Sequence, residues 1–253
     1  MNYEDVQKVS NAAKAKSNLV NTNFFKYFIR AVMAGFFIDV AMIYSNVVGN
    51  VFSKTMPEWG KFMGALVFSI AVLLISFVGG ELFTGNNMVM AMGVYTKTCK
   101  VSDMIKTWVI SYIGNFVGSF ILGGLFVWSN ASHQILVDYY RSFIYTKLDA
   151  TPMELFIRGV LCNFLVCLAV YTGMKLKSES GKMIMMFCII TAFVLAGFEH
   201  CVANMGTFTI GYMLLGDIGT AAVIKSQFFV TLGNIVGGAV LLAFPLKQMS
   251  AEH

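Results

Sequence analysis

Two nine-residue stretches interrupt long apolar runs and decide how this chain folds. They read GGELFTGNN at residues 79–87 and GFEHCVANM at residues 197–205. Where glycines and polar side chains occur in the middle of a membrane span, some backbone groups lose their helical hydrogen-bond partners. Such groups are tolerated at membrane depth only inside protein or beside a water-filled cavity. Both stretches are therefore predicted to be breaks in membrane helices that face a buried path.

The composition around these breaks is that of a membrane protein. Of 253 residues, 57% are hydrophobic and 12% are charged, and the mean hydropathy is +0.72. Soluble domains are about 45–50% apolar and about 25% charged. Because a span needs about 20 apolar residues, the chain is expected to be all-α with six spans. They are expected at about 28–51, 62–95, 104–128, 153–174, 183–215 and 218–246, with the breaks in the second and fifth.

The two halves of the chain repeat each other. The pattern G-x-E-x4-N occurs at 79–86 and again 118 residues later, and GNFVG at 114–118 is echoed by GNIVG at 233–237. Each half has three spans, so the repeats must cross the bilayer in opposite directions, a plan that places substrate paths at broken helices. The predicted organisation is an N-terminal segment at 1–27 able to form an amphipathic helix, a single transmembrane domain at 28–247 and a tail at 248–253. Repeat one covers about 28–129 and repeat two about 153–247.

Basic residues give the orientation. Six spans put both termini on one side, together with the loops near 97–106 and 175–182. That side carries twelve Lys and Arg residues, and the opposite side carries six. Because basic residues gather in cytoplasmic loops, both termini are expected in the cytoplasm. The net charge of +5 reports this topology and gives no reason to expect a nucleic-acid partner.

The breaks carry the chemistry-bearing residues. Glu81 and Glu199 are ionisable groups inside apolar runs, and such groups are functional candidates by default; they either brace the breaks or contact a permeant ion. Half-helices that begin at the breaks would aim positive dipole ends inward, which favours anions. His200 would be neutral in an empty path and protonated beside an anion, so an anion could borrow its proton and cross as a neutral acid. Thr84 could offer a hydroxyl to the same place.

Lys147 has two interpretations. It is expected on the side opposite the termini, where it could raise the local concentration of anions by long-range attraction. As one lysine in a polar connection, it could equally be an ordinary solvated side chain.

The motifs at the breaks closely resemble those of the formate–nitrite transporter family. The resemblance rests on residues 79–85 and 197–205, with LCNFLV at 161–166 and GNFVG at 114–118, and it extends over about residues 10–247. The chain looks most like the hydrosulfide and formate channels of anaerobic bacteria. The resemblance implies an aquaporin-like bundle of six spans that assembles as a homopentamer, with a pore through each subunit.

The resemblance also implies roles for individual side chains. His200 and Thr84 would lie at the pore centre between two apolar constrictions, and Lys147 would attract anions. The outer constriction would comprise Phe68, Leu82 and Phe193, the inner one Val72, Phe83 and Val166, and the loops would be supported by Glu81, Glu199, Asn204 and Asn163. Val72 departs from the leucine that formate channels often have there, which leaves the width of the inner pore open. Apolar rings reject hydrated ions because removing their water is costly.

These observations predict a passive channel for small monovalent weak-acid anions, namely hydrosulfide, formate and nitrite, in the inner membrane of a bacterium. A proton-coupled anion symporter of the same fold is the main alternative, and a membrane enzyme or a structural subunit fits less well. No paired acid–base set is visible, and five dispersed cysteines and three histidines match no metal-binding spacing. We expect no enzymatic activity, cofactor or metal, and partners limited to small anions, the lipid bilayer and further copies of the chain.

Overall fold

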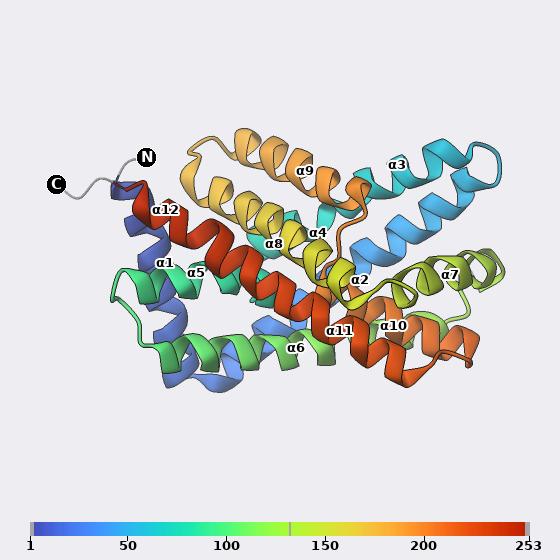
Figure 1. Ribbon diagram of the computed structural model, residues 1–253, viewed down its shortest axis with the longest axis horizontal. Helices are drawn as coiled ribbons and strands as arrows, with labels where there is room; N and C mark the ends of the chain where they lie inside the picture. The colour runs from blue at the N-terminus through green and yellow to red at the C-terminus, as the bar shows by residue number, and fades with distance from the viewer. Residues whose placement is uncertain (1–2, 132, 251–253) are drawn as a thin grey trace.

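The computed structural model describes residues 3–131 and 133–250, and every regular element within them is helical. Six helical runs in these ranges are long and apolar enough to cross a membrane, as the sequence predicted. The bundle that they form is elongated along one axis (Figure 1). The runs are α2 (Phe24–Ser53), α3 (Pro57–Phe68) with α4 (Ile70–Leu74) and the π-helix η1 (Ile75–Gly79), α6 (Val101–Trp128), α8 (Pro152–Lys175), α9 (Glu179–Ala196), and α11 (Thr220–Ile235) with η2 (Val236–Ala243) and α12 (Phe244–Gln248).

The predicted breaks interrupt the second and fifth spans. At the first break Gly79 has a φ of +101°, and the chain runs extended through Gly80 and Leu82 before α5 (Phe83–Tyr95) begins. At the second break Gly197 ends α9 with a φ of +76°, and His200 is extended just before α10 (Cys201–Leu215). A left-handed φ suits glycine because it has no Cβ. Each span is therefore two half-helices joined by an extended link.

Each half of the chain also begins with a helix outside the six spans. The first is α1 (Tyr3–Thr22), whose apolar side is buried against α5. The second is α7 (His133–Leu148), which packs on α2 and α10. An amphipathic N-terminal helix was predicted from the sequence and corresponds to α1, but residues 129–151 were expected to be a polar connection, so α7 was not predicted. The internal repeat therefore includes a leading helix on each side.

The glycine motifs of the repeat bring spans together within the subunit. Helix α6 lies along α2, and α11 lies along α8. A Cβ on Gly118 would overlap the carbonyl oxygen of Val32, and one on Gly237 would overlap that of Val160. Small residues permit this close backbone approach, which packing in lipid requires. The two motifs thus fix equivalent helix pairs in the two repeats.

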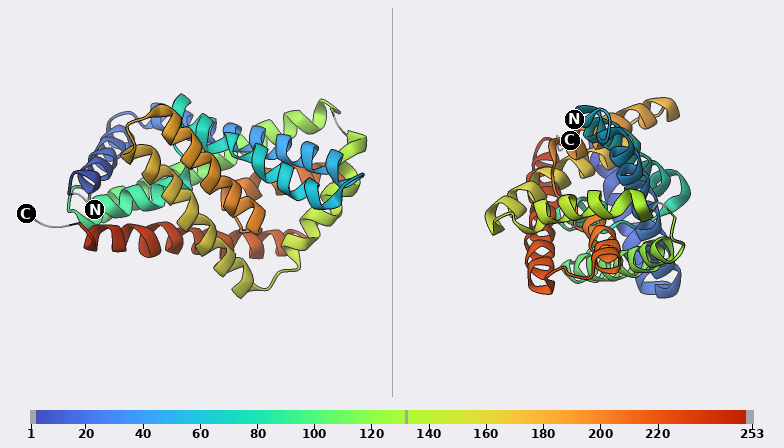
Figure 2. Two further views of the ribbon diagram at one scale, coloured as in Figure 1. Left: turned by 90° about the horizontal axis from the view of Figure 1, so that it is seen from above. Right: turned by 90° about the vertical axis from the view of Figure 1, so that its right-hand side faces the viewer.

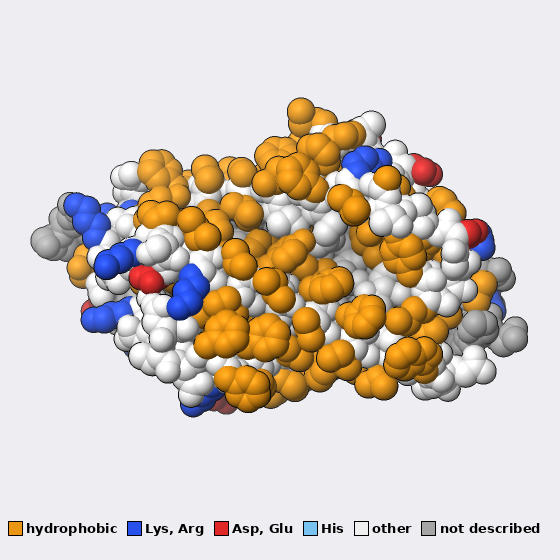
Figure 3. Space-filling model, turned by 90° about the horizontal axis from the view of Figure 1, so that it is seen from below, with side chains coloured by type: hydrophobic (Ala, Val, Ile, Leu, Met, Phe, Trp, Pro, Cys, Tyr) orange, Lys and Arg blue, Asp and Glu red, His pale blue; other side chains and the backbone are white. Residues whose placement is uncertain are grey.

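The surface matches a lipid environment. Both termini lie at one end of the long axis (Figures 1 and 2). Figure 3 shows hydrophobic side chains over the middle of one long face, with charged side chains gathered toward the two ends. Helix α6 alone exposes Ile113, Phe116 and Phe120 by 47–50%. Large apolar side chains in such a continuous band are covered by lipid or by another subunit.

Candidate functional site

The two breaks meet at one hydrogen bond between the repeats. Thr84, in the first turn of α5, places its Oγ1 2.9 Å from Nε2 of His200, and both side chains are buried. Nδ1 of His200 accepts the backbone N–H of Ala203 at 3.1 Å and so caps α10. Because Nδ1 is an acceptor, the ring hydrogen is on Nε2 and is donated to Thr84. The Thr84 hydroxyl hydrogen is then available for another acceptor.

Asn115 on α6 holds the first break open. Its Nδ2 donates to the carbonyl oxygens of Ala31 and Glu81 at 2.8 and 3.0 Å. Its Oδ1 accepts the N–H of Phe83, the first residue of α5, at 2.9 Å. One side chain thus replaces the helical partners that the break removes, as a buried backbone group requires.

Asn234 on α11 does the same for the second break. Its Nδ2 donates to the carbonyl oxygens of Gly159 and Glu199 at 2.8 and 2.9 Å, and its Oδ1 accepts the N–H of Cys201 at 2.9 Å. The sequence showed Asn234 only as part of a repeated packing motif. Its position in both copies of GN-x2-G was the signal that could have identified the role.

The two intramembrane glutamates are both paired with a lysine and an asparagine. The Glu81 carboxylate accepts from Lys16 Nζ at 2.5 Å and from Asn86 Nδ2 at 3.3 Å. The Glu199 carboxylate accepts from Lys147 at 2.9 Å and from Asn204 at 2.9 Å. The lysines come from the two leading helices, so Lys16 is the counterpart of Lys147.

These ion pairs are largely shielded from water. The side chains of Lys147 and Glu199 are 13% and 5% exposed, and those of Lys16 and Glu81 are 18% and 7% exposed. Lys147 also donates to Asn204 Oδ1 at 3.1 Å. The structure therefore places Lys147 against the break itself rather than in open solvent. Sequence analysis did not identify Lys16 as a site residue.

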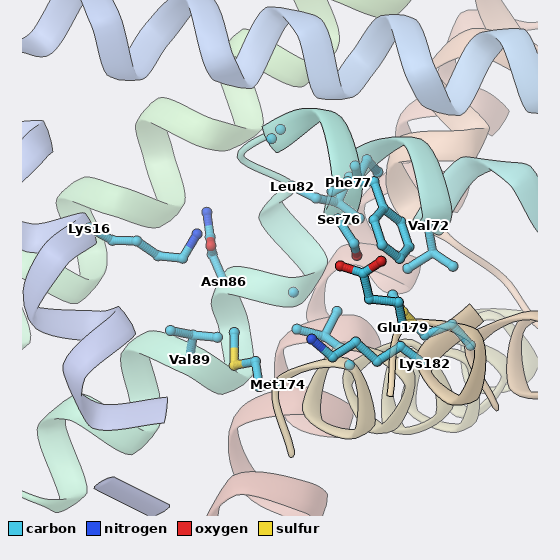
Figure 4. A pocket seen from close by; sticks show the side chains of 17 residues that line it. Lys16, Val72, Ser76, Phe77, Leu82, Asn86, Val89, Met174, Glu179 and Lys182 are labelled. Carbon is cyan, nitrogen blue, oxygen red and sulfur yellow. The ribbon is translucent and has the colours of Figure 1, made fainter. Parts of the chain in front are cut away.

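A wide cavity lies on either side of the Thr84–His200 contact. The first, here named the Lys147 vestibule, has a volume of about 310 Å³ and is lined by Lys147, Phe193 and His200, among others. The second, the Lys16 vestibule, has a volume of about 480 Å³. Figure 4 shows Lys16 pointing into it toward Asn86, while Glu179 and Lys182 reach in from α9.

A narrow central cavity shares lining residues with both vestibules. It has a volume of about 10 Å³, which is about the minimum for one water molecule. Its lining is apolar apart from one imidazole: Ile38, Phe68, Ala71, Val72, Ile75, Leu82, Val166, Ile190, Phe193 and His200. An ion that passes must therefore lose nearly all of its hydration shell.

The predicted constriction residues divide between the two ends of this passage. Phe68 and Phe193 pack edge to face with ring centroids 5.9 Å apart and also line the Lys147 vestibule. Val72 and Leu82 line the Lys16 vestibule as well as the central cavity, although Leu82 was expected in the outer ring. Phe83 is buried with its ring 5.0 Å from that of Tyr112 and lies behind the lining.

Asn163 on α8 connects the two repeats behind the passage. Its Nδ2 lies within hydrogen-bonding distance of three oxygens: the carbonyls of Thr84 and Asn234, at 3.2 and 2.6 Å, and Oδ1 of Asn87, at 3.0 Å. Asn163 thus holds the start of α5 against α11. It contacts the support of the centre and does not line the central cavity.

Comparison with known proteins agrees with this architecture. A family model described as formate/nitrite transporter matches residues 3–247. The chain belongs to this family. It is 31% identical over 261 residues to a Bacillus subtilis strain 168 protein described as uncharacterized transporter YwcJ, with 100% of both chains covered.

Solved structures share the whole fold. One described as an FNT family ion channel superposes with a TM-score of 0.92 at 27% identity, and the match covers 98% of this chain and 99% of that chain. Another, described as a pentameric formate channel with formate bound, gives a TM-score of 0.76 at 29% identity, with 89% and 96% covered. Together with the six apolar runs, these matches establish a multi-pass membrane protein of the formate/nitrite transporter family, which is a family of transporters and not of enzymes.

Proposed function

We propose that the chain is a passive channel for small monovalent weak-acid anions, including formate, nitrite and hydrosulfide. The observation that carries this proposal is the meeting of two half-helix starts at the Thr84–His200 contact, with the imidazole lining an apolar cavity of about 10 Å³. The family description names formate and nitrite, and a solved relative is a formate channel with formate bound. Hydrosulfide is included because it is a small anion of a weak acid that meets the same physical requirements.

Selectivity follows from desolvation in this proposal. A hydrated ion cannot enter a space that holds one water, and the apolar lining replaces few of the lost hydrogen bonds. A small anion keeps one strong contact at the centre, because Thr84 accepts from His200 and turns its own hydroxyl hydrogen to the anion. The helix starts of α5 and α10 add favourable electrostatic potential for negative charge.

The position of His200 favours a hydrogen-bonding role over a stored proton. The neutral ring has its single hydrogen on Nε2, while Nδ1 caps Ala203. To lend a proton, the ring must first be protonated at Nδ1, which removes the acceptor of the Ala203 N–H. Protonation of His200 therefore removes the hydrogen bond that caps α10, which contributes about 1 kcal/mol. This cost supports passive conduction over proton-coupled symport.

Assembly and orientation complete the proposal. A solved relative of the same fold is described as pentameric, and we assign a homopentamer with one passage in each subunit. The twelve-to-six distribution of basic residues supports an orientation with both termini on the cytoplasmic side of a bacterial inner membrane. The Lys147 vestibule then faces outward and the Lys16 vestibule inward, and Lys147 draws anions toward the passage.

Fluxes in proteoliposomes test the proposal. Formate, nitrite and hydrosulfide are measured side by side for the wild type, Thr84→Val and His200→Phe. Thr207→Val is the matched control, because Thr207 lines the Lys147 vestibule and its hydroxyl donates to the carbonyl oxygen of Ala203 rather than pairing with His200. We expect flux that does not saturate in the wild type and the control, and at least a tenfold loss in the two centre variants.

Two results would contradict it. Saturating uptake with a fixed number of protons per anion would establish symport. Full flux in both Thr84→Val and His200→Phe would remove the pair from the transport path.

A further inference from the structure

A carboxylate lies in the middle of the first span without a partner. Asp39 on α2 is 0% exposed, and neither of its oxygens has a hydrogen-bond partner among the described residues. Unlike Glu81 and Glu199, it has no lysine or arginine within ion-pairing distance there. The transport path described above does not use Asp39.

Three helices close around this carboxylate. A Cβ built on Gly206 of α10 would overlap it, and one built on Gly123 of α6 would lie 3.5 Å from Oδ2. Ser119, one turn before Gly123, presents a buried hydroxyl that makes no well-formed hydrogen bond in the described part of the chain but faces the Asp39 carboxyl group. Tyr140 of α7 is a titratable group that interacts electrostatically with Asp39, and its hydroxyl already contacts Asn46 and Met42.

The charge state follows from these surroundings. An isolated ionised carboxylate in an apolar interior is far more costly than a hydrogen-bonded neutral group. A neutral acid needs one acceptor and one donor, and a serine hydroxyl can supply either. The Ser119 hydroxyl stands beside the carboxyl group, and α2, α6 and α10 all converge there.

We propose that Asp39 is held as a neutral carboxylic acid and is a positioning residue for α10. Gly206 lies six residues after His200 on the same helix, about 9 Å along its axis. Contact between Asp39 and Gly206 therefore sets the depth of α10, and with it the position of the imidazole that caps the helix. The inference rests on the proposed function only for its transport readout.

The protonation state is tested by infrared spectroscopy on the reconstituted protein. The wild type should show the C=O stretch of a protonated carboxylic acid at pH 7 and pH 8, and Asp39→Asn should lack that band.

Thermal stability gives a second readout. The folded wild type must keep a proton that an unfolded aspartate releases above about pH 4, so its stability should fall as pH rises. The advantage in Tm of Asp39→Asn over the wild type should therefore grow from pH 5 to pH 8.

The positioning role is tested by conservative rescue and by a size exchange. Asp39→Asn should keep formate flux within twofold of the wild type, whereas Asp39→Ala should lose at least fivefold. Gly206→Ala should lower both Tm and flux, and Gly206→Ala combined with Asp39→Ala should recover part of each. Gly219→Ala is the matched control, because a Cβ there meets no atom within 4 Å.

Each outcome decides the inference. A wild-type spectrum without the acid band at pH 7, or an Asp39→Asn variant that loses flux as Asp39→Ala does, would overturn it. If the wild type carries none of the anions, the proposed function fails while the infrared band and the pH dependence of Tm still test Asp39.

Discussion

Removing the side chain that clamps the second break should destabilise the subunit and reduce its flux. Asn234→Ala deletes three hydrogen bonds, to Gly159, Glu199 and Cys201. Each such bond contributes about 1 kcal/mol net, and buried groups left unpaired cost about 1–3 kcal/mol each. The expected loss in unfolding free energy is therefore at least about 3 kcal/mol. A displaced break also moves His200, so flux should fall more than tenfold.

The assay compares matched variants. Thermal unfolding in detergent and formate flux in proteoliposomes are measured for Asn234→Ala, for its counterpart in the other repeat, Asn115→Ala, and for Asn21→Ala on the exposed face of α1. The two clamp variants should lose stability by similar amounts because their hydrogen bonds correspond one for one. Asn21→Ala should lose less than 1 kcal/mol, as exposed sites usually do. Clamp variants that match the Asn21→Ala control in Tm and flux would refute the clamp.

Three further predictions use other parts of the structure. Lys147→Gln leaves Glu199 buried without its cation and should cost about 3 kcal/mol, and adding Glu199→Gln should restore stability. Phe193→Ala removes one of two packed rings at the passage, so acetate flux should rise severalfold relative to formate in the same vesicles. Outside the spans, Arg141 donates to Asp217 and lowers the pKa of its carboxyl; this contribution exists above about pH 4 and disappears at lower pH. The difference in Tm between the wild type and Asp217→Asn should vanish on acidification.

The breaks could be predicted from sequence because their signal is local. A run of apolar residues interrupted by Gly79 and Glu81, and again by Gly197 and Glu199, violates the pattern of an unbroken span wherever it occurs. The repeat then required the two interruptions to face each other. The contact between Thr84 and His200 is the direct consequence of that inverted arrangement.

The ion pairs could not be found in the same way. Lys16 and Lys147 occupy equivalent positions on the leading helices, yet they are 131 residues apart in a chain whose break motifs repeat every 118. The length of a segment before a span is not fixed by the thickness of the membrane. The number of residues between the lysine and the break motif can therefore differ between the repeats, although the packing is equivalent. Only tertiary contact of α1 with α5 and of α7 with α10 shows that the two lysines are counterparts.

Asp39 was missed for a different reason. It is visible in the sequence as the one acidic residue within the apolar first span, but it lies outside both break motifs. A charged residue in lipid is expected to find a partner, and three-dimensional packing is needed to see that Asp39 has none among its described neighbours. The space that the Asp39 carboxyl group fills is available because Gly206 has no side chain. A fit between a side chain and the space beside a glycine that is distant in sequence produces no periodic pattern.

The chemistry of His200 shows most clearly what geometry adds to residue type. A histidine near the middle of a membrane suggests a proton carrier, because its charge changes near neutral pH. The structure gives Nδ1 to the N–H of Ala203 and Nε2 to Thr84, so both nitrogens already have partners in the neutral ring. Protonation of Nδ1 would place its N–H opposite the N–H of Ala203, and both of these groups are donors. Under the proposed function, a histidine built into a helix start in this way acts as a fixed donor, and a weak acid takes its accompanying proton from water in a vestibule rather than from the ring.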